Sequence, residues 1–349
     1  MVALIKYAAN ATITKARAMY GNRLKDADYK ELASKKNVSE AAEYLKRNTH
    51  FSEAFSTLNT ASIHRGHIES VIRRNAFDEY IELCSFQQLG NSKFYNYLIV
   101  LSEIREILSV ILHMNAESSE DYISTMPAYL ISKASIDLFE LAHSRNFKEL
   151  MQAIKHTPYY YALEGIECDD SGKVDYLNCE LVLRTYYFQW LTDVVKKDFK
   201  GSPRTVLINQ IQMQVDFINI INAYRMKKYY GLSSDEIEKH SLPFYGKLNL
   251  KKHKEIFNLK TAEEFISAFS KTFYGRKMST ESYENFELEI NMQRSVAAKR
   301  SLMFSTNPAV SIFSFVYLMD VEVNNIITII EGIRYEKKRE YILNRIVTI

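Results

Sequence analysis

Two histidines and a glutamate form a compact cluster of possible metal ligands in this sequence. His64 and His67 are three residues apart, Glu69 follows, and two imidazoles with a carboxylate can bind zinc. The favoured interpretation is a polar patch or packed histidines, because no His-Glu-x-x-His pattern occurs. The sequence also contains neither Gly-x-x-x-x-Gly-Lys-Ser/Thr nor Gly-x-Gly-x-x-Gly, so a classical nucleotide loop has no support. We therefore expect no catalytic residue, no cofactor site and no metal site.

A turn-rich segment after Cys168 gathers a second group of oxygen ligands. Asp169, Asp170 and Asp175 surround Gly172 and superficially resemble a calcium loop. The segment lacks the full spacing of such a loop and its closing bidentate glutamate, so an exposed turn is the favoured interpretation. This is also the one place in the sequence where a short β-ribbon is plausible.

Three acids recur at equivalent places along the chain: Glu69, Glu180 and Glu287. Each is followed three residues later by isoleucine or leucine, and Arg73 and Arg184 follow the first two at i,i+4 spacing. One hypothesis is that the three acids contact a basic partner. The favoured alternative is an ion pair or cap within each domain, as between Glu69 and Arg73 or between Glu180 and Arg184.

The elements that position these residues are predicted to be helices. Apolar residues recur at steps of three and four over residues 97–111, 208–221 and 316–333, which predicts three long amphipathic helices. Pro308 precedes the third stripe, where a helix start tolerates proline. The chain has 10 glycines and 5 prolines, so few positions interrupt a helix. The predicted fold class is all-α.

The three helices recur about every 110 residues, and shorter helices precede them over residues 39–45, 148–154 and 262–269. Each short helix is followed by a threonine with an aromatic residue two positions later, at Thr49, Thr157 and Thr272. Each long helix carries an acid, at Glu103, Asp216 and Glu322. We therefore predict three homologous helical repeats over residues 1–115, 116–231 and 232–349. Since repeats of this size can each bury a core, a pseudo-threefold ring or funnel is preferred to a solenoid.

Composition limits the partners and the compartment. The net charge of +3 is small and the basic residues are interleaved with acids, which argues against nucleic acid as a partner. The odd number of cysteines, 3, indicates a reducing compartment. We expect no signal peptide and no transmembrane segment, because the longest apolar stretch, 309–319, is too short to cross a bilayer.

Several apolar and aromatic side chains are assigned to the core. Cys84 and Trp190, the single tryptophan, are expected there. Tyrosine suits interfaces, because it has an apolar body and a polar tip, but ordinary helix packing is the preferred role for the tyrosines in two clusters. These tyrosines are Tyr159, Tyr160, Tyr161, Tyr229 and Tyr230.

The whole chain resembles the C subunit of the prokaryotic A/V-type rotary ATPases, which is equivalent to the d subunit of the eukaryotic enzymes. The resemblance rests on residues 7–18, 28–32, 40–45, 63–69 and 322–327, in the order expected for that family, and on the three repeats. Asn291, where a basic residue would follow Glu287, and the tyrosine-rich middle repeat depart from the pattern. Arg65, Glu69, Glu180, Arg184 and Glu287 are the candidates for contact with a partner.

The resemblance implies a non-catalytic rotor component. Proteins of this family form a funnel of three helical domains on the cytoplasmic face of the membrane, as peripheral proteins. The funnel joins the central-stalk subunits to the membrane proteolipid ring, so torque passes between ATP hydrolysis or synthesis and ion transport. No nucleic acid and no small-molecule substrate is implied. The repeats alone would equally fit a soluble helical adaptor outside any ATPase, and an enzyme with an unrecognised pocket is a third possibility.

Overall fold

The computed structural model describes residues 2–85, 92–118, 122–123, 126–278 and 285–349. Within these ranges the regular elements are helices, and β-structure is limited to one isolated antiparallel bridge between Cys168 and Val174. The all-α prediction is confirmed. The isolated bridge lies in the turn after Cys168, where the sequence made a short ribbon plausible. The chain forms two compact units, Met1–Gly90 with Lys277–Ile349 and Asn91–Arg276, called unit 1 and unit 2 below. The division into three repeats remains a prediction.

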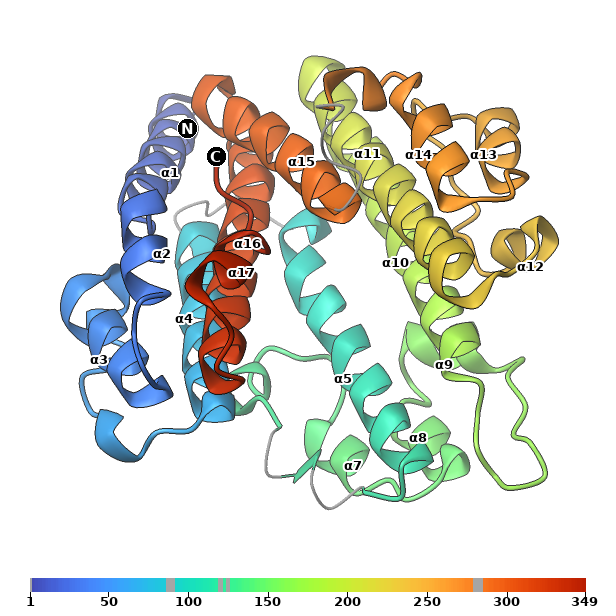
Figure 1. Cartoon of the computed structure of the whole chain (residues 1–349), viewed down its shortest axis with the longest axis horizontal. Coiled ribbons are helices and arrows are strands. Elements are labelled where there is room, and N and C mark those ends of the chain that lie inside the picture. The colour runs from blue at the N-terminus through green and yellow to red at the C-terminus, as the bar shows by residue number, and fades with distance from the viewer. Residues whose placement is uncertain (1, 86–91, 119–121, 124–125, 279–284) are drawn as a thin grey trace. The chain divides into compact units, whose positions relative to one another are not determined.

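Unit 1 is built around its longest helix, α16, which contacts α1, α4 and α15 (Figure 1). The helix begins at Pro308, where Asn307 caps it by accepting hydrogen bonds from the amides of Ala309 and Val310. The predicted apolar stripe over 316–333 is confirmed, because its six residues are buried: Val316, Met319, Val323, Ile326, Ile330 and Ile333. The helices of unit 1 are α1 (Val2–Gly21), α2 (Asp26–Leu32), α3 (Val38–Asn48), η1 (His50–Ser52), η2 (Thr60–Ser62), α4 (Arg65–Ser85), α15 (Phe286–Phe304), α16 (Pro308–Arg334) and α17 (Arg339–Leu343).

By length and composition α16 is apolar enough to cross a membrane, and it is the one such helix in the part of the chain that the structure describes. However, 67% of its most apolar window is buried inside the protein. The core helix of a compact unit has this character, because it must present apolar side chains to neighbours on several sides. Burial among α1, α4 and α15 therefore accounts for the hydrophobicity of α16.

Unit 2 contains three long helices, α5, α10 and α11, of which α10 contacts the other two (Figure 1). The predicted helix over 97–111 is α5, and Tyr97, Ile104, Leu108 and Ile111 of its stripe are buried. The helices of unit 2 are η3 (Lys93–Asn96), α5 (Tyr97–Asn115), η4 (Ala128–Leu130), α7 (Leu138–Ala142), α8 (Phe147–Ala153), α9 (Pro158–Leu163), α10 (Tyr176–Asp198), α11 (Gly201–Arg225), a π-helical turn η5 (Met226–Tyr230), α12 (Ser234–Lys239), α13 (Leu250–Phe257) and α14 (Ala262–Ser270), with η6 (Gly275–Lys277) at the sequence boundary.

The stripe predicted for α11 is only partly right. Ile211 and Val215 are buried, but Ile208, Ile218 and Ile221 are only partly so. The buried face also includes two polar residues, Asp216 and Asn219, which a search for apolar periodicity passes over.

The three predicted short helices are present as α3, α8 and α14. Each begins with the same capping arrangement, in which an asparagine or threonine side chain accepts a hydrogen bond from the amide of a glutamate three residues later. Each is followed by the predicted threonine. The threonine hydroxyl donates a hydrogen bond of 2.6–2.7 Å to a backbone carbonyl at the end of the helix. The chain thus repeats three times the same cap at the start of a short helix and the same threonine after its end.

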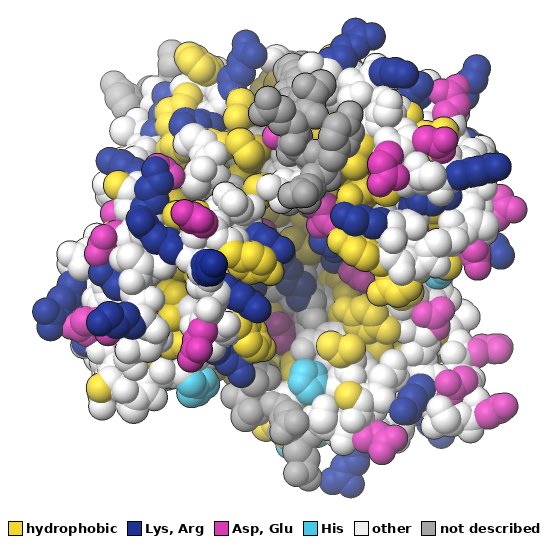
Figure 2. All heavy atoms as spheres, in the orientation of Figure 1, with side chains coloured by type: hydrophobic (Ala, Val, Ile, Leu, Met, Phe, Trp, Pro, Cys, Tyr) yellow, Lys and Arg dark blue, Asp and Glu magenta, His cyan; other side chains and the backbone are white. Residues whose placement is uncertain are grey.

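The charged side chains on the surface are interleaved, as they are in the sequence. Figure 2 shows Lys and Arg side chains interleaved with Asp and Glu over the visible face. Two assignments to the core are wrong, because Cys84 and Trp190 are only partly buried. Among the tyrosines, Tyr159 is buried as expected, but three others are largely exposed. These are Tyr161, Tyr229 and Tyr230, at 72%, 64% and 75%.

Candidate functional site

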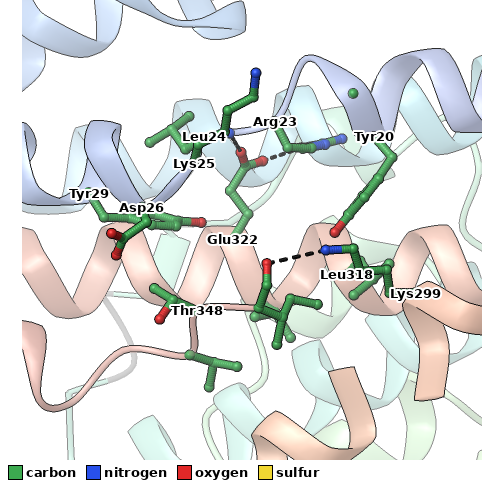
Figure 3. Close-up of a pocket in the computed structure, with 14 residues that line it drawn as sticks. Tyr20, Arg23, Leu24, Lys25, Asp26, Tyr29, Lys299, Leu318, Glu322 and Thr348 are labelled. Atoms are coloured by element: carbon green, nitrogen blue, oxygen red, sulfur yellow. Dashed lines mark hydrogen bonds and ion pairs between the residues drawn. The ribbon is translucent and has the colours of Figure 1, made fainter. Parts of the chain in front are cut away.

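A buried carboxylate on α16 holds the turn between α1 and α2 in unit 1. Glu322 is 3% exposed and points from α16 toward that turn, as Figure 3 shows. One carboxylate oxygen accepts a hydrogen bond of 2.7 Å from the amide of Leu24, and the other pairs with the guanidinium of Arg23. Arg23 also pairs with Glu79 of α4 and lies over the ring of Phe315, 5.0 Å from its centroid. Three segments of unit 1 therefore meet at one charge cluster.

His50 completes this cluster. Its Nε2 lies 3.2 Å from Glu322, and its Nδ1 lies 3.6 Å from Glu79. Burial alone would raise the pKa of Glu322, but Arg23 and His50 outweigh it and hold the pKa below its usual value. Burial alone would lower the pKa of His50, but its contacts with Glu322 and Glu79 raise the pKa overall. Both shifts favour the charged forms, so the cluster balances two carboxylates against two cations.

A second buried acid lies on α11 in unit 2. Asp216 is fully buried and accepts hydrogen bonds from the amides of Gly246 and Leu248, at 2.9 and 3.2 Å, and from the phenol of Tyr274, at 3.0 Å. Burial raises the pKa of Asp216 in spite of these donors and of His253 nearby. Burial also lowers the pKa of His253. This site therefore works mainly through hydrogen bonds to neutral donors.

The third acid, Glu103 of α5, is arranged in the same way. It is 1% exposed, and it accepts hydrogen bonds from the amide of Ser135 and the phenol of Tyr159. Tyr159 lies two residues after Thr157, and Tyr274 lies two residues after Thr272. The aromatic position of the sequence repeat is thus the donor to a buried acid in both cases. In unit 1 this position is Phe51, and the neighbouring His50 contacts Glu322 instead.

The three acids share one role. Each binds a segment that is distant from it in the sequence. Glu103 binds residues of the next predicted repeat, Asp216 binds residues of the one after that, and Glu322 binds residues of the first. Each acid combines a backbone amide with a side-chain donor, which satisfies a carboxylate that has lost its water. Such sites position segments, and we call them the acid anchors.

The predicted partner-contact residues in unit 1 form a separate network near the surface. Glu69 pairs with Arg65 at 2.8 Å and with Arg73 at 2.9 Å, all on α4. Arg65 also reaches Glu331 of α16, at 2.6 Å. The predicted ion pair between Glu69 and Arg73 is therefore confirmed, while contact of Arg65 and Glu69 with a partner remains a proposal.

The other candidates lie on different helices. Glu180 and Arg184 form the predicted ion pair on α10 of unit 2, with 2.6 Å between the charged groups. Glu287 lies in the first turn of α15 in unit 1, where the helix dipole favours an acid. Each candidate is explained locally, so partner contact remains a proposal for these three residues as well.

Sequence reasoning finds the acid anchors only as markers of the repeat. Glu103, Asp216 and Glu322 are recognised by their spacing, but their burial is not predicted, and Arg23 and His50 are missed. The usable signal is the aromatic residue two positions after each threonine, because two of the three are tyrosines with a hydroxyl to donate.

A cavity of about 400 Å3 lies beside the Glu322 anchor and is lined by residues of α1, α2, α15, α16 and the last residues of the chain (Figure 3). Two of its cationic wall groups are already engaged: Arg23 with two carboxylates, and Lys299 with the carbonyl of Ile349 at 3.3 Å. Within the described residues, no three His, Cys, Asp or Glu side chains are grouped as they would be around a metal ion. The described clusters thus support positioning of segments.

Comparison with known proteins gives one consistent result. The profile of the ATP synthase (C/AC39) subunit family matches residues 12–345. The A-type ATP synthase C subunit of Methanosphaera stadtmanae is 22% identical over 328 residues, which cover 89% of this chain and 80% of that protein. The A-type ATP synthase C subunit of Desulfurococcus sp. is 22% identical over 252 residues, covering 71% and 65%.

A shorter but more similar stretch aligns with a third relative. The A-type ATP synthase C subunit of Methanosarcina mazei is 29% identical over 140 residues, which cover 40% of this chain. That alignment spans 36% of the length of the relative.

Proposed function

Because the chain belongs to the ATP synthase (C/AC39) subunit family, we propose that it is the rotor component that couples the central stalk to the membrane proteolipid ring of an A/V-type ATPase. The observation that carries the proposal is the family match over residues 12–345, nearly the whole chain. In this proposal the protein has no catalytic site of its own. It lies at the cytoplasmic face of the membrane as a peripheral protein.

The acid anchors support a mechanical role. A coupler that carries torque must resist local opening, and local opening is easiest where few buried contacts hold a segment. In this chain, buried carboxylates on long helices bind backbone amides of three segments that lie between helices. Release of a segment would leave the buried carboxylate short of a hydrogen-bond donor that water does not replace, so each anchor resists partial release.

The three acids also support the proposed arrangement of three homologous repeats as a funnel. Each predicted repeat supplies one acid to a segment of another predicted repeat, so the contacts follow the order of the repeats. In the proposal, the wide end of the funnel receives the stalk and the other end rests on the ring.

The test is coupling in membranes depleted of this protein. Membrane vesicles that carry the ATPase are prepared without the chain, and ATP hydrolysis and ion pumping are measured before and after the purified chain is added back. We expect hydrolysis without pumping in its absence, and pumping restored on addition. Full pumping by vesicles that lack the chain would rule out the coupling role and would favour an adaptor outside the ATPase.

A further inference from the structure

Unit 2 carries an open groove of about 1020 Å3 that the acid anchors do not fill. Its floor is one face of α10, where Val182, Tyr186 and Trp190 follow one another at helical spacing. One wall is α9, which contributes Tyr161, and the opposite wall includes Phe244. Tyr161 is 72% exposed, and the other aromatic lining residues are partly exposed. An open groove lined by aromatic side chains is a feature of binding sites.

The α9 wall and the floor of the groove are held by the Glu103 anchor. The ring of Tyr186 packs edge-on against Tyr159, with 5.6 Å between centroids, and Tyr159 donates to Glu103. Burial raises the pKa of Tyr186, and the charge of Glu103 raises it further, so the two groups lie in one environment. This wall is therefore fixed before any partner arrives.

The opposite wall is held by α11. The side-chain amide of Asn219 donates to the carbonyl of Leu242 at 3.0 Å and accepts from the amide of Leu242 at 2.8 Å. Asp216 accepts a hydrogen bond from the amide of Gly246. The wall residue Phe244 lies between these two fixed points in the chain. A groove with both walls fixed loses little conformational entropy on binding, which favours affinity.

One end of the groove is basic. Lys93 and Lys197 both line it. Their segments adjoin, because Ser92 donates to Asp198 at 2.6 Å and the rings of Phe94 and Phe199 lie 5.1 Å apart. In the ranges that the structure describes, neither lysine forms an ion pair. The acid that lines the groove, Asp193, is hydrogen-bonded to Gln189. The groove therefore offers an apolar centre and, at one end, two lysines that are not in an ion pair.

We propose that this groove binds an amphipathic helix of the central stalk, with an apolar stripe against Tyr186 and Trp190 and an acidic residue facing Lys93 and Lys197. The proposal rests on the coupling role proposed above and names one contact surface for it. From Val182 to Lys197 the floor extends roughly 22 Å, at about 1.5 Å per residue, which suits about four turns of a helix. Helix-in-groove recognition uses this geometry.

The polar character of the rim favours the stalk over the membrane ring as the source of the helix. Gln189 and Asp193 at the rim are exposed and hydrogen-bond to each other at 2.7 Å. Polar groups at the rim require that the outer face of the bound helix remain in water. A stalk helix meets that condition, whereas a lipid-embedded helix does not.

Trp190 gives a direct readout, because it is the single tryptophan of the chain. The full-length chain is titrated with the purified central-stalk subunits while Trp190 emission is followed. A Trp190→Phe variant supplies the background from tryptophans of the stalk. We expect a blue shift as the bound helix removes water from the partly exposed indole. Binding should weaken about ten-fold in Lys197→Glu, which reverses a cation facing the proposed acid.

Lys196→Glu is the matched control, because it makes the same charge change one residue away on the same helix but outside the groove. If the complex forms in size-exclusion chromatography with Trp190 emission unchanged, or if both lysine variants weaken it equally, the groove proposal is wrong while the coupling role stands. If no complex with the stalk forms, both proposals fail. An emission shift caused by the detergent-solubilised proteolipid ring in place of the stalk would also overturn the proposed occupant.

Discussion

The phenol of Tyr274 donates a hydrogen bond of 3.0 Å to Asp216, and that of Tyr159 donates to Glu103 in the same manner. The partners are 58 residues apart in the first pair and 56 in the second. In both pairs the acid lies on a long helix, and the tyrosine lies two residues after a threonine that follows a short helix. Helix α9, which contains Tyr159, and the segment after α14, which contains Tyr274, are thus each attached to a long helix by a buried acid.

The first prediction concerns the hydroxyl of this pair. Tyr274→Phe leaves the buried carboxylate of Asp216 with its backbone donors alone, so the free energy of unfolding should fall by about 1–3 kcal/mol. Urea unfolding followed by circular dichroism measures the change. Tyr161→Phe is the control, because Tyr161 is 72% exposed and should show no measurable effect. Equal stability of the two variants would mean that the Asp216 anchor does not stabilise the fold.

The second prediction concerns the charge of Glu322. Glu322→Gln removes one partner of Arg23 in a cluster where both side chains are at least nine-tenths buried. Breaking a buried ion pair on one side typically destabilises by about 3–5 kcal/mol, and we expect a loss of that order in urea unfolding. The matched control is Glu31→Gln, which removes an exposed i,i+4 pair with Lys35 and should leave stability nearly unchanged. A Glu322→Gln variant as stable as the control would contradict the anchor.

The third prediction is a pH dependence that originates at His50. Its pKa is raised in the folded protein, so its stabilising contribution is complete below the unfolded pKa of about 6.5 and is lost as the pH rises through the folded pKa. The melting temperature of the wild type should therefore fall more than that of His50→Gln as the pH rises above about 6.5. The lowered pKa of His253 acts below about pH 6.5 and does not interfere in this window. If the melting temperatures of the two proteins change with pH in parallel, His50 is not the origin of the pH dependence.

The fourth prediction tests the close approach at the Asp216 anchor. A Cβ at Gly246 would lie 2.5 Å from the Asp216 carboxylate and 2.9 Å from Cβ of Gln212, so Gly246→Ala forces the wall of the groove to move. Overpacking of this kind costs about 1–3 kcal/mol, measured as a loss in the free energy of unfolding. Gly165→Ala should not share the loss, because nothing lies within 4 Å of its added Cβ. If both variants lose the same stability, helix or turn propensity is responsible and the contact is not.

The sequence predicts the helices well because their signals are local. The stripe of α16 and the caps of α3, α8 and α14 depend on residues within a few positions of one another. The acid anchors depend on chain contacts that span many residues, so Glu322 can be recognised by its spacing and not by its partner Leu24, 298 residues away. The core assignment of Trp190 is wrong for a related reason, since apolar character favours the core but does not reveal a groove on the exposed face of α10.

The Glu322 anchor also has a consequence for how the chain is made. A ribosome releases Leu24 and Arg23 almost 300 residues before the carboxylate that binds them. Unit 2 is continuous in sequence and can fold during synthesis, while the N-terminal part of unit 1 must wait for α16. A chain truncated before residue 308 would therefore contain the first helices without their central partner α16. The apolar faces of these helices would be exposed to water, so such a chain would be a substrate for chaperones and proteases.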